Sequence, residues 1–375
     1  MALTPDFRRV TADAGRLDLA NAPEGFDALV MADIARARGG LTVFIARDAG
    51  RASAFIDAMG FFAPGLEILR FPAWDCLPYD RVGPSAGVAA ERMATLTTLA
   101  RGMDPKTPVL LVTQAPAVLQ RVPPRSAVTR AGYSARSGNH VNIAEVERYF
   151  AINGYVRAST VSERGEFAIR GGVIDVFPPG ADEPVRLDLF GETLESIRGF
   201  DRETQRSTRQ LKSADLMPVS EPLLAPESIA RFRRGYLEAF GAPGDDPLYE
   251  TVSAGGRRAG LEHWLPLFYP GMETLFDYLP PTTLIGVDHL VGEARDERLA
   301  MVEDAFDARA EAERKANYRP LPPAGLYLDA AEWDARIDAF PNRRFSPFVR
   351  EGEQVIDMGA RLGRTFAAER AQDSV

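Results

Sequence analysis

The sequence predicts an α/β scaffold, built on an open parallel sheet, that carries a smaller inserted α+β unit. Three short apolar runs predict buried strands of the sheet: Leu41–Ala46, Leu66–Phe71 and Val109–Val112. Helical patterns alternate with these runs, as is typical of parallel sheets. Between about residues 123 and 213 the runs give way to shorter alternating stretches, and a further buried run, Thr283–Val287, follows. We expect this last run to complete the first sheet.

The scaffold begins with a helix, a strand and a second helix. Apolar residues recur at helical spacing from Phe26 to Ile34, and Gly39-Gly40 ends this first helix. The strand at Leu41–Ala46 leads into another helical pattern at Ala52–Met59. A third helix is expected at Gly87–Arg101, before the strand at Val109.

The loop after the first predicted strand lacks the residues that bind nucleotide phosphates. A P-loop nucleoside triphosphatase carries a glycine-rich loop with Gly-Lys-Ser/Thr at this place, and its backbone amides and lysine hold the phosphates. No Gly-Lys pair occurs anywhere in this chain. The sequence therefore predicts a degenerate P-loop fold, and we expect no nucleotide to bind at this loop. The loop consists of Arg47, Asp48, Ala49, Gly50, Arg51, Ala52 and Ser53.

The inserted unit begins after Pro123-Pro124, which breaks the chain and predicts a linker. A helix is expected at Ile143–Gly154, followed by an extended segment, Tyr155–Val161, and two or three short strands. The charged stretch Arg198–Arg209 is expected to leave the sheet.

One face of the predicted small sheet carries an unusual set of side chains. From Val185 to Leu194 the residues alternate, so the leucines point to one face and Arg186, Asp188 and Phe190 to the other. Arg170 ends the preceding strand on its polar face. Arginine and aromatic residues are enriched at protein–protein hot spots, which makes this face a candidate docking surface. The alternative is an ordinary solvated sheet in which a neighbouring element covers Phe190.

The C-terminal part returns to helical and apolar patterns. Helices are expected at Pro226–Phe240 and at Ala300–Asn317. Glu262-His263 could suggest catalysis, but a single such pair without a second His or a Ser partner is more typical of packing. Zinc-protease, nucleophile-elbow and calcium-loop motifs are absent from the sequence. We therefore predict no catalytic residue and no metal site.

Composition excludes several classes of protein. The formal net charge of −9 argues against a non-specific clamp on nucleic acid, which needs many Lys and Arg. The single cysteine, Cys76, excludes an internal disulfide and suits the cytosol, so a cytoplasmic location is expected. No apolar run reaches the roughly 18 residues that a membrane span requires, and no signal peptide is evident.

Three separated blocks resemble a known family. Gly165–Gly180 (GEFAIRGGVIDVFPPG) and Val185–Ser207 (VRLDLFGETLESIRGFDRETQRS) are similar to the second domain shared by UvrB and the transcription-repair coupling factors (Mfd). Phe71–Leu96 (FPAWDCLPYDRVGPSAGVAAERMATL) resembles a block of their first domain, and Ala259–Tyr269 (AGLEHWLPLFY) a block typical of the coupling factors. The degenerate phosphate loop, and the short segment between Tyr79 and the next helix, favour the N-terminal UvrB-like region of the coupling factors over UvrB.

The resemblance implies a domain plan and a function. A UvrB-like α/β domain would occupy residues 1–122 and 214–345, an inserted UvrA-binding domain residues 123–213, and a linker or the start of another domain residues 346–375. Arg170, Arg186 and Phe190 match the family's UvrA-recognition positions. The full-length protein would be an ATP-dependent double-stranded DNA translocase that displaces stalled RNA polymerase and recruits excision repair.

The resemblance also implies where cofactors and other partners act. ATP and Mg are expected only in motor domains beyond this chain, which itself needs no cofactor. RNA polymerase and double-stranded DNA would bind further domains, and a C-terminal domain would mask the UvrA-binding face. Alternatives are a UvrB-like ATP-dependent helicase that acts with UvrA, a weak DNA-binding sheet, and a stand-alone adaptor.

Overall fold

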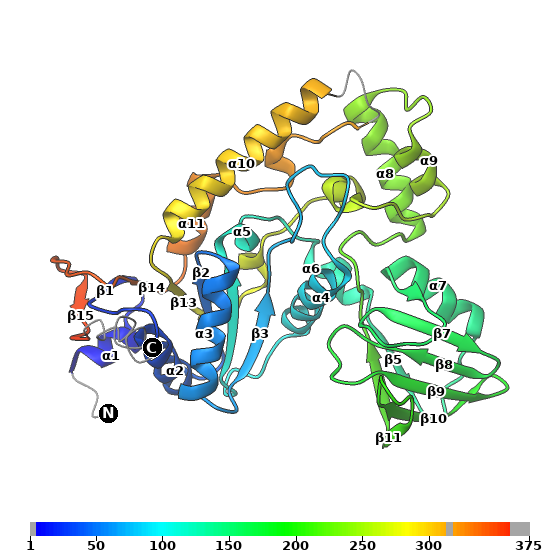
Figure 1. Ribbon diagram of the computed structural model, residues 1–375, viewed down its shortest axis with the longest axis horizontal. Coiled ribbons are helices and arrows are strands. Elements are labelled where there is room, and N and C mark those ends of the chain that lie inside the picture. Colours follow the sequence, from blue (N-terminus) through cyan, green and yellow to red (C-terminus); the bar gives the residue numbers. More distant parts are fainter. Residues whose placement is uncertain (1–4, 313–317, 361–375) are drawn as a thin grey trace, which may run out of the picture.

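A large parallel sheet forms the centre of the scaffold in the computed structural model, which describes residues 5–312 and 318–360 (Figure 1). Within these residues it has seven strands in the order β15-β1-β14-β13-β2-β4-β3, and all the pairings are parallel. The strands are β1 (Arg16–Ala20), β2 (Leu41–Ala46), β3 (Glu67–Phe71), β4 (Val109–Gln114), β13 (Leu284–Val287), β14 (Asn342–Phe345) and β15 (Val355–Asp357).

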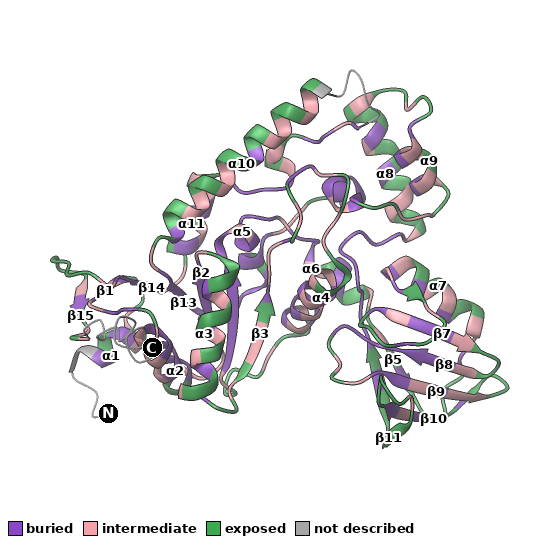
Figure 2. Ribbon diagram, viewed as in Figure 1, coloured by how far each residue is buried: buried purple, intermediate pink, exposed green. Residues whose placement is uncertain are grey.

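The four strands expected from apolar runs lie side by side in this sheet. Every residue of β2, β4 and β13 is buried, as Figure 2 shows for β2 and β13. The α/β fold class is thus confirmed, and β13 joins the sheet from beyond the inserted unit. The sequence did not predict β1, β14 or β15. Residues 355–357 fall in the stretch expected to be a linker or the start of another domain, and they form the edge strand β15 beside β1. Three residues are too few to show a periodicity in the sequence. Residues 361–375 lie outside the described part.

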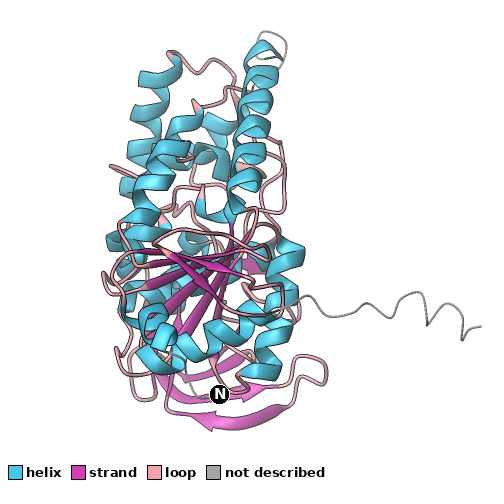
Figure 3. Ribbon diagram, turned by 90° about the vertical axis from the view of Figure 1, so that its left-hand side faces the viewer, coloured by secondary structure: helices cyan, strands magenta, loops and turns pink. Residues whose placement is uncertain are grey.

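Helices cover both faces of the large sheet (Figure 3). On one face, β2 contributes Phe44 to a core with α2 (Phe26–Arg38) and α3 (Ala49–Phe62). On the other face, Val43 and Ile45 pack with α4 (Ala86–Arg101) and α11 (Ala330–Asp338). Alternate residues of one buried strand therefore serve two cores, which explains its continuous apolar sequence.

Further helices pack around the scaffold. They are α1 (Pro5–Ala12), α5 (Ala115–Val118), α6 (Arg125–Arg130), α8 (Pro226–Phe240), α9 (Pro247–Ser253), η1 (Leu261–Phe268), η2 (Leu275–Tyr278) and η4 (Pro323–Gly325), together with the long α10 (Val291–Ala312). An aromatic-rich core joins α8, η1 and α10. Residues 313–317 of the helix expected there lie outside the described part. Among the helices that are described, none is both long and apolar enough to cross a bilayer.

The inserted unit has a separate sheet in the order β11-β10-β9-β8-β7-β6. Its strands are β6 (Val156–Arg157), β7 (Glu166–Arg170), β8 (Val173–Val176), β9 (Val185–Phe190), β10 (Thr193–Phe200) and β11 (Ser207–Leu211), while β5 (Tyr133–Arg136) pairs with β12 (Ser213–Leu216). The expectation that Arg198–Arg209 leaves the sheet is wrong, because β10 extends to Phe200 and β11 pairs with it. An edge strand keeps its charges in solvent, so the charged sequence does not prevent pairing.

Helix α7 (Ile143–Asn153) covers one face of the small sheet. Asn142 caps its start by accepting hydrogen bonds from the amides of Ala144 and Glu145. Gly154 ends it in the left-handed conformation, with φ of 86°. A Cβ at position 154 would lie 2.6 Å from the Cβ of Ser220, so this turn also needs a residue without a side chain. The helix packs Val146 and Phe150 onto the leucine face of the sheet, which leaves the opposite face for the charged residues.

Candidate protein-binding face

The strand register gathers charged side chains on the small-sheet face opposite α7. Asp175 on β8 lies opposite Arg186 on β9, and Arg186 lies opposite Arg198 on β10. Paired residues point to the same side of a sheet, so these three form a row across it. We define the docking face as this row and the side chains next to it: Arg170, Asp175, Arg186, Asp188, Phe190 and Arg198.

Asp175 is the buried centre of the docking face. Its side chain is only 2% exposed, and it accepts hydrogen bonds from Nε and Nη2 of Arg186 at 2.7 and 3.0 Å. Arg170 approaches the same carboxylate, with 3.6 Å between Nη1 and Oδ2, and donates a second bond to the Ser159 carbonyl. Asp175 thus brings together the two arginines that the sequence predicted. Asp175 was not predicted from the sequence, although its place on a short strand next to Arg186 was a signal.

Arg186 and Arg170 differ in how much of each side chain reaches solvent. Arg186 is 20% exposed and lies 4.9 Å from the ring centre of Phe200, above a small apolar cluster. The hydrogen bond that Arg186 donates to Asp175 is the main reason that the pKa of Arg186 is raised. Arg170 is 54% exposed. Arg186 therefore forms part of the framework, whereas Arg170 presents more of its guanidinium to a partner.

A second carboxylate neutralises the other end of the row. Asp188 accepts hydrogen bonds from Ser196 at 2.7 Å and from Nη2 of Arg198 at 2.8 Å. Arg198 and Arg186 lie directly opposite each other, and such like charges repel unless counter-ions separate them. The two aspartates supply those counter-ions, so the arginines keep fixed positions without a bound partner.

Phe190 lies at the end of β9, next to this charged row. Its side chain is 81% exposed, and no element in the described part of the chain covers it. On the same strand Leu187 is buried and Leu189 packs against the α7 core, as the alternation predicted. The alternative, in which a neighbouring element covers Phe190, is not seen in the described part of the chain. A large ring held in water beside ordered charges is typical of a binding surface.

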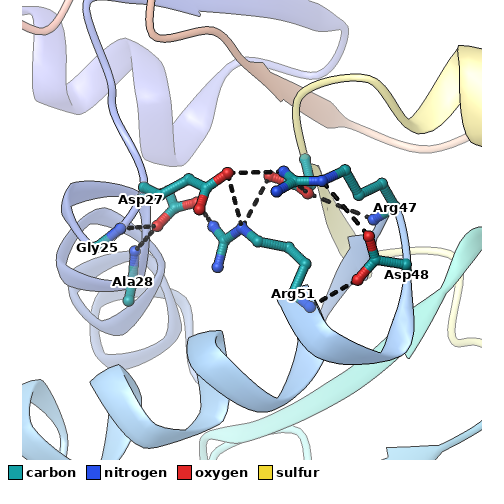
Figure 4. A network of polar contacts seen from close by, with 8 residues as sticks. Gly25, Asp27, Ala28, Arg47, Asp48 and Arg51 are labelled. Atoms are coloured by element: carbon teal, nitrogen blue, oxygen red, sulfur yellow. Dashed lines mark hydrogen bonds and ion pairs between the residues drawn. The ribbon is translucent and has the colours of Figure 1, made fainter.

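The degenerate loop at the start of α3 is filled by the protein's own charged side chains (Figure 4). Asp48 caps the helix by accepting a hydrogen bond from the Arg51 amide at 2.7 Å. The Arg51 guanidinium, which is 3% exposed, pairs with Asp27 and, at 3.2 Å, with Asp288. Arg47 also pairs with Asp288, at 3.3 Å.

This network has electrostatic consequences for the loop. Burial raises the pKa of Asp27 to about 6 and raises that of Asp288 too, although Arg51 opposes both shifts. Anionic phosphates would meet two buried carboxylates at the place where P-loop enzymes hold them. That these residues bind no nucleotide stays a prediction.

His263 is placed for packing. It is buried beside Trp74 and Tyr79, and its Nε2 lies 3.3 Å from the Val82 carbonyl. Burial lowers the pKa of His263 to about 4 and raises that of Glu262 to about 7. Within the described residues, no group of three or more His, Cys, Asp and Glu is arranged to hold a metal.

Comparisons with known proteins place the docking face inside a known family of domains. Residues 134–221 match the UvrB interaction domain family, and this range includes the whole docking face. The chain is 32% identical over 330 residues to a transcription-repair-coupling factor of Haemophilus influenzae, covering 87% of this chain and 28% of that protein. The Escherichia coli factor is 30% identical over 320 residues, or 84% of this chain and 27% of that protein.

A more distant relative extends the similarity. The transcription-repair-coupling factor of Bacillus subtilis is 27% identical over 238 residues, which cover 60% of this chain and 20% of that protein. The chain thus spans less than a third of the length of these relatives. The resemblance found in the sequence is confirmed: residues 134–221 form a UvrB interaction domain, in a chain that corresponds to the UvrB-like region of the transcription-repair-coupling factors.

Proposed function

We propose that this chain is the recruiting module of a transcription-repair coupling factor and that its docking face binds UvrA. The main support is Phe190, which is 81% exposed beside a row of arginines whose positions are fixed by buried or half-buried aspartates. This arrangement lies inside the part of the chain that matches the UvrB interaction domain.

In this proposal each predicted recognition residue has its own role. Phe190 inserts into an apolar pocket of UvrA, and Arg170 pairs with a carboxylate there. Arg186 keeps two of its donors on Asp175 and offers Nη1 to the partner, so it also positions the strand. Truncating an anchor of this kind typically costs about 1–4 kcal/mol of binding free energy.

The longer protein carries the remaining activities in this proposal. Motor domains outside this chain use ATP and Mg to translocate on double-stranded DNA and to displace RNA polymerase. A C-terminal domain of the same protein masks the docking face until the motor engages. All of this takes place in the cytoplasm, where the excision-repair proteins act on the chromosome.

Titration calorimetry of this chain with purified UvrA tests the proposal. We expect Phe190→Ala and Arg170→Ala each to weaken binding about tenfold or more, which corresponds to at least about 1.4 kcal/mol. The matched control is Phe61→Ala, because Phe61 is also a largely exposed ring (79%) but lies on α3 of the scaffold. Unchanged affinity in the double variant Arg170→Ala, Phe190→Ala contradicts the assignment of this face.

A further inference from the structure

A cavity of about 590 Å³ opens on the side of the molecule that the docking face does not use. Residues of α6, α7 and α8 line it, together with residues at and just after the end of η1. Figure 1 shows where these helices lie. Helix α7 packs against the leucine face of the small sheet, so the cavity and Phe190 lie on opposite sides of that sheet. The cavity is large enough for a small organic molecule.

The walls of the cavity are mainly apolar and aromatic. Tyr133 and Tyr149 form a ring pair with centroids 5.4 Å apart, and Phe268 and Leu223 contribute from the scaffold. Tyr149 is held in place because its hydroxyl donates a hydrogen bond to the Ala131 carbonyl at 3.0 Å. Flat rings with fixed orientations are suited to contact another flat ring.

Three arginines surround these walls, each from a different helix: Arg130 on α6, Arg148 on α7 and Arg231 on α8. All three are exposed, and none of their side chains has a hydrogen bond or ion pair with another residue in the described ranges. Elsewhere on α7 the chain does form a surface pair, between Glu147 and Arg157 at 3.1 Å. Glu145 and Glu227 are the acidic residues that line the cavity, so arginines outnumber carboxylates there.

We propose that this cavity binds a small molecule with a flat aromatic body and an anionic group, either a phosphate or a carboxylate. The rings accept the body, and the planar guanidinium groups bind the anion with paired hydrogen bonds. Because α7 belongs to the inserted unit and α8 to the scaffold, such a ligand contacts both parts of the chain at once. The site shares no residue with the docking face, so its test does not depend on UvrA binding.

Fluorescence titration with 1-anilinonaphthalene-8-sulfonate, an anionic aromatic dye, tests the site in the whole chain. We expect saturable binding of one dye molecule, and a loss of affinity of about fivefold or more in Arg148→Ala and in Arg231→Ala. The matched control is Arg234→Ala, which removes an exposed arginine of α8 outside the cavity and leaves the affinity within twofold. Dye binding that survives in the double variant Arg148→Ala, Arg231→Ala overturns the proposal.

Further titrations identify where the dye binds and whether its charge contributes to binding. N-phenyl-1-naphthylamine, its uncharged analogue, is expected to bind more weakly, and equal affinity overturns the role of the arginines. Loss of dye binding in Phe190→Ala overturns the location, because the dye then occupies the docking face. Displacement by phenyl phosphate or by benzoate supports the proposal and names the preferred anion, whereas displacement by neither one overturns it.

Discussion

Arg92 and Glu221 form an ion pair that is almost completely shielded from solvent, with side chains 0% and 2% exposed. Nε of Arg92 lies 2.5 Å from Oε1 of Glu221, and Nη1 donates to the Pro72 carbonyl and to Gln120. Arg92 lies on α4 of the scaffold, and Glu221 follows the last strand of the inserted unit. The pair therefore fixes the point at which the chain re-enters the scaffold.

Removing one partner of this pair should destabilise the protein strongly. Arg92→Ala leaves the Glu221 carboxylate buried without its counter-ion, which typically costs about 3–5 kcal/mol of unfolding free energy. Chemical denaturation measures this loss. The control is Arg101→Ala, which breaks the 3.4 Å pair with Asp215 between the same two parts of the chain, where both side chains are about half exposed. That change should cost less than about 1 kcal/mol, and equal losses contradict the prediction.

Arg186 should matter for the stability of the inserted unit as well as for binding. Arg186→Ala removes two hydrogen bonds from the buried Asp175, so we expect a loss of about 2–4 kcal/mol in thermal or chemical unfolding. Arg170→Ala removes a 3.6 Å contact with Asp175 and a hydrogen bond to the Ser159 carbonyl, both made by a half-exposed side chain, and should cost under about 1 kcal/mol. Reversed costs for the two variants contradict the view that Arg186 is the framework residue.

His263 should make the protein sensitive to acid. Its pKa is about 4 in the folded state, below the usual value near 6.5, so the unfolded chain binds more protons between these two pH values. Stability attributable to His263 is therefore present above pH 6.5 and falls by up to about 3 kcal/mol as the pH drops to 4.

Unfolding curves at several pH values test this sensitivity. In His263→Phe the loss of stability between pH 6.5 and 4 should be smaller by about this amount, because phenylalanine does not titrate. His140, which is exposed beside Glu192, provides the matched control His140→Gln. An identical pH dependence in the His263→Phe variant and the unaltered chain rules out the buried imidazole as its source.

The chain alone should not hydrolyse ATP. The two carboxylates that hold Arg51 occupy the place of a phosphate-binding loop, so phosphate release should stay at background with or without duplex DNA. Arg51→Lys supplies an ammonium group but should not create activity, because Asp27 and Asp288 remain. DNA-stimulated hydrolysis that Asp288→Asn abolishes contradicts this prediction and supports the helicase alternative.

The sequence predicted the scaffold where local chemistry determines the structure. Continuous apolar runs identified β2, β4 and β13 because both faces of these strands are buried. Strand β14 escaped prediction because it contains Arg343, which is fully buried. Its guanidinium donates hydrogen bonds to the carbonyls of Val10, Asp13 and Gly15 near the other end of the chain. Only the fold brings those acceptors to the strand, so no local pattern reveals it.

The candidate site, too, was predicted only where the pattern of a single strand determines it. Alternation along one strand placed Arg186 and Phe190 on the same face, as the structure has them. The pairings with Asp175 and between Arg198 and Asp188 depend on the register between neighbouring strands, which a single strand does not specify. The cavity with three unpaired arginines was not predicted either, since its walls come from separate helices.

The strand order of the two sheets sets the sequence in which they can be completed during translation. Every strand of the small sheet lies between residues 156 and 211, so that sheet can close as soon as this stretch leaves the ribosome. In the large sheet, the strands that pair with β1 in the described part of the chain are β14 and β15, so Leu19 cannot pair until Phe345 has been synthesised. The recruiting unit can therefore fold while its host is still incomplete, and slow, long-range pairing falls to the part that carries no docking residue.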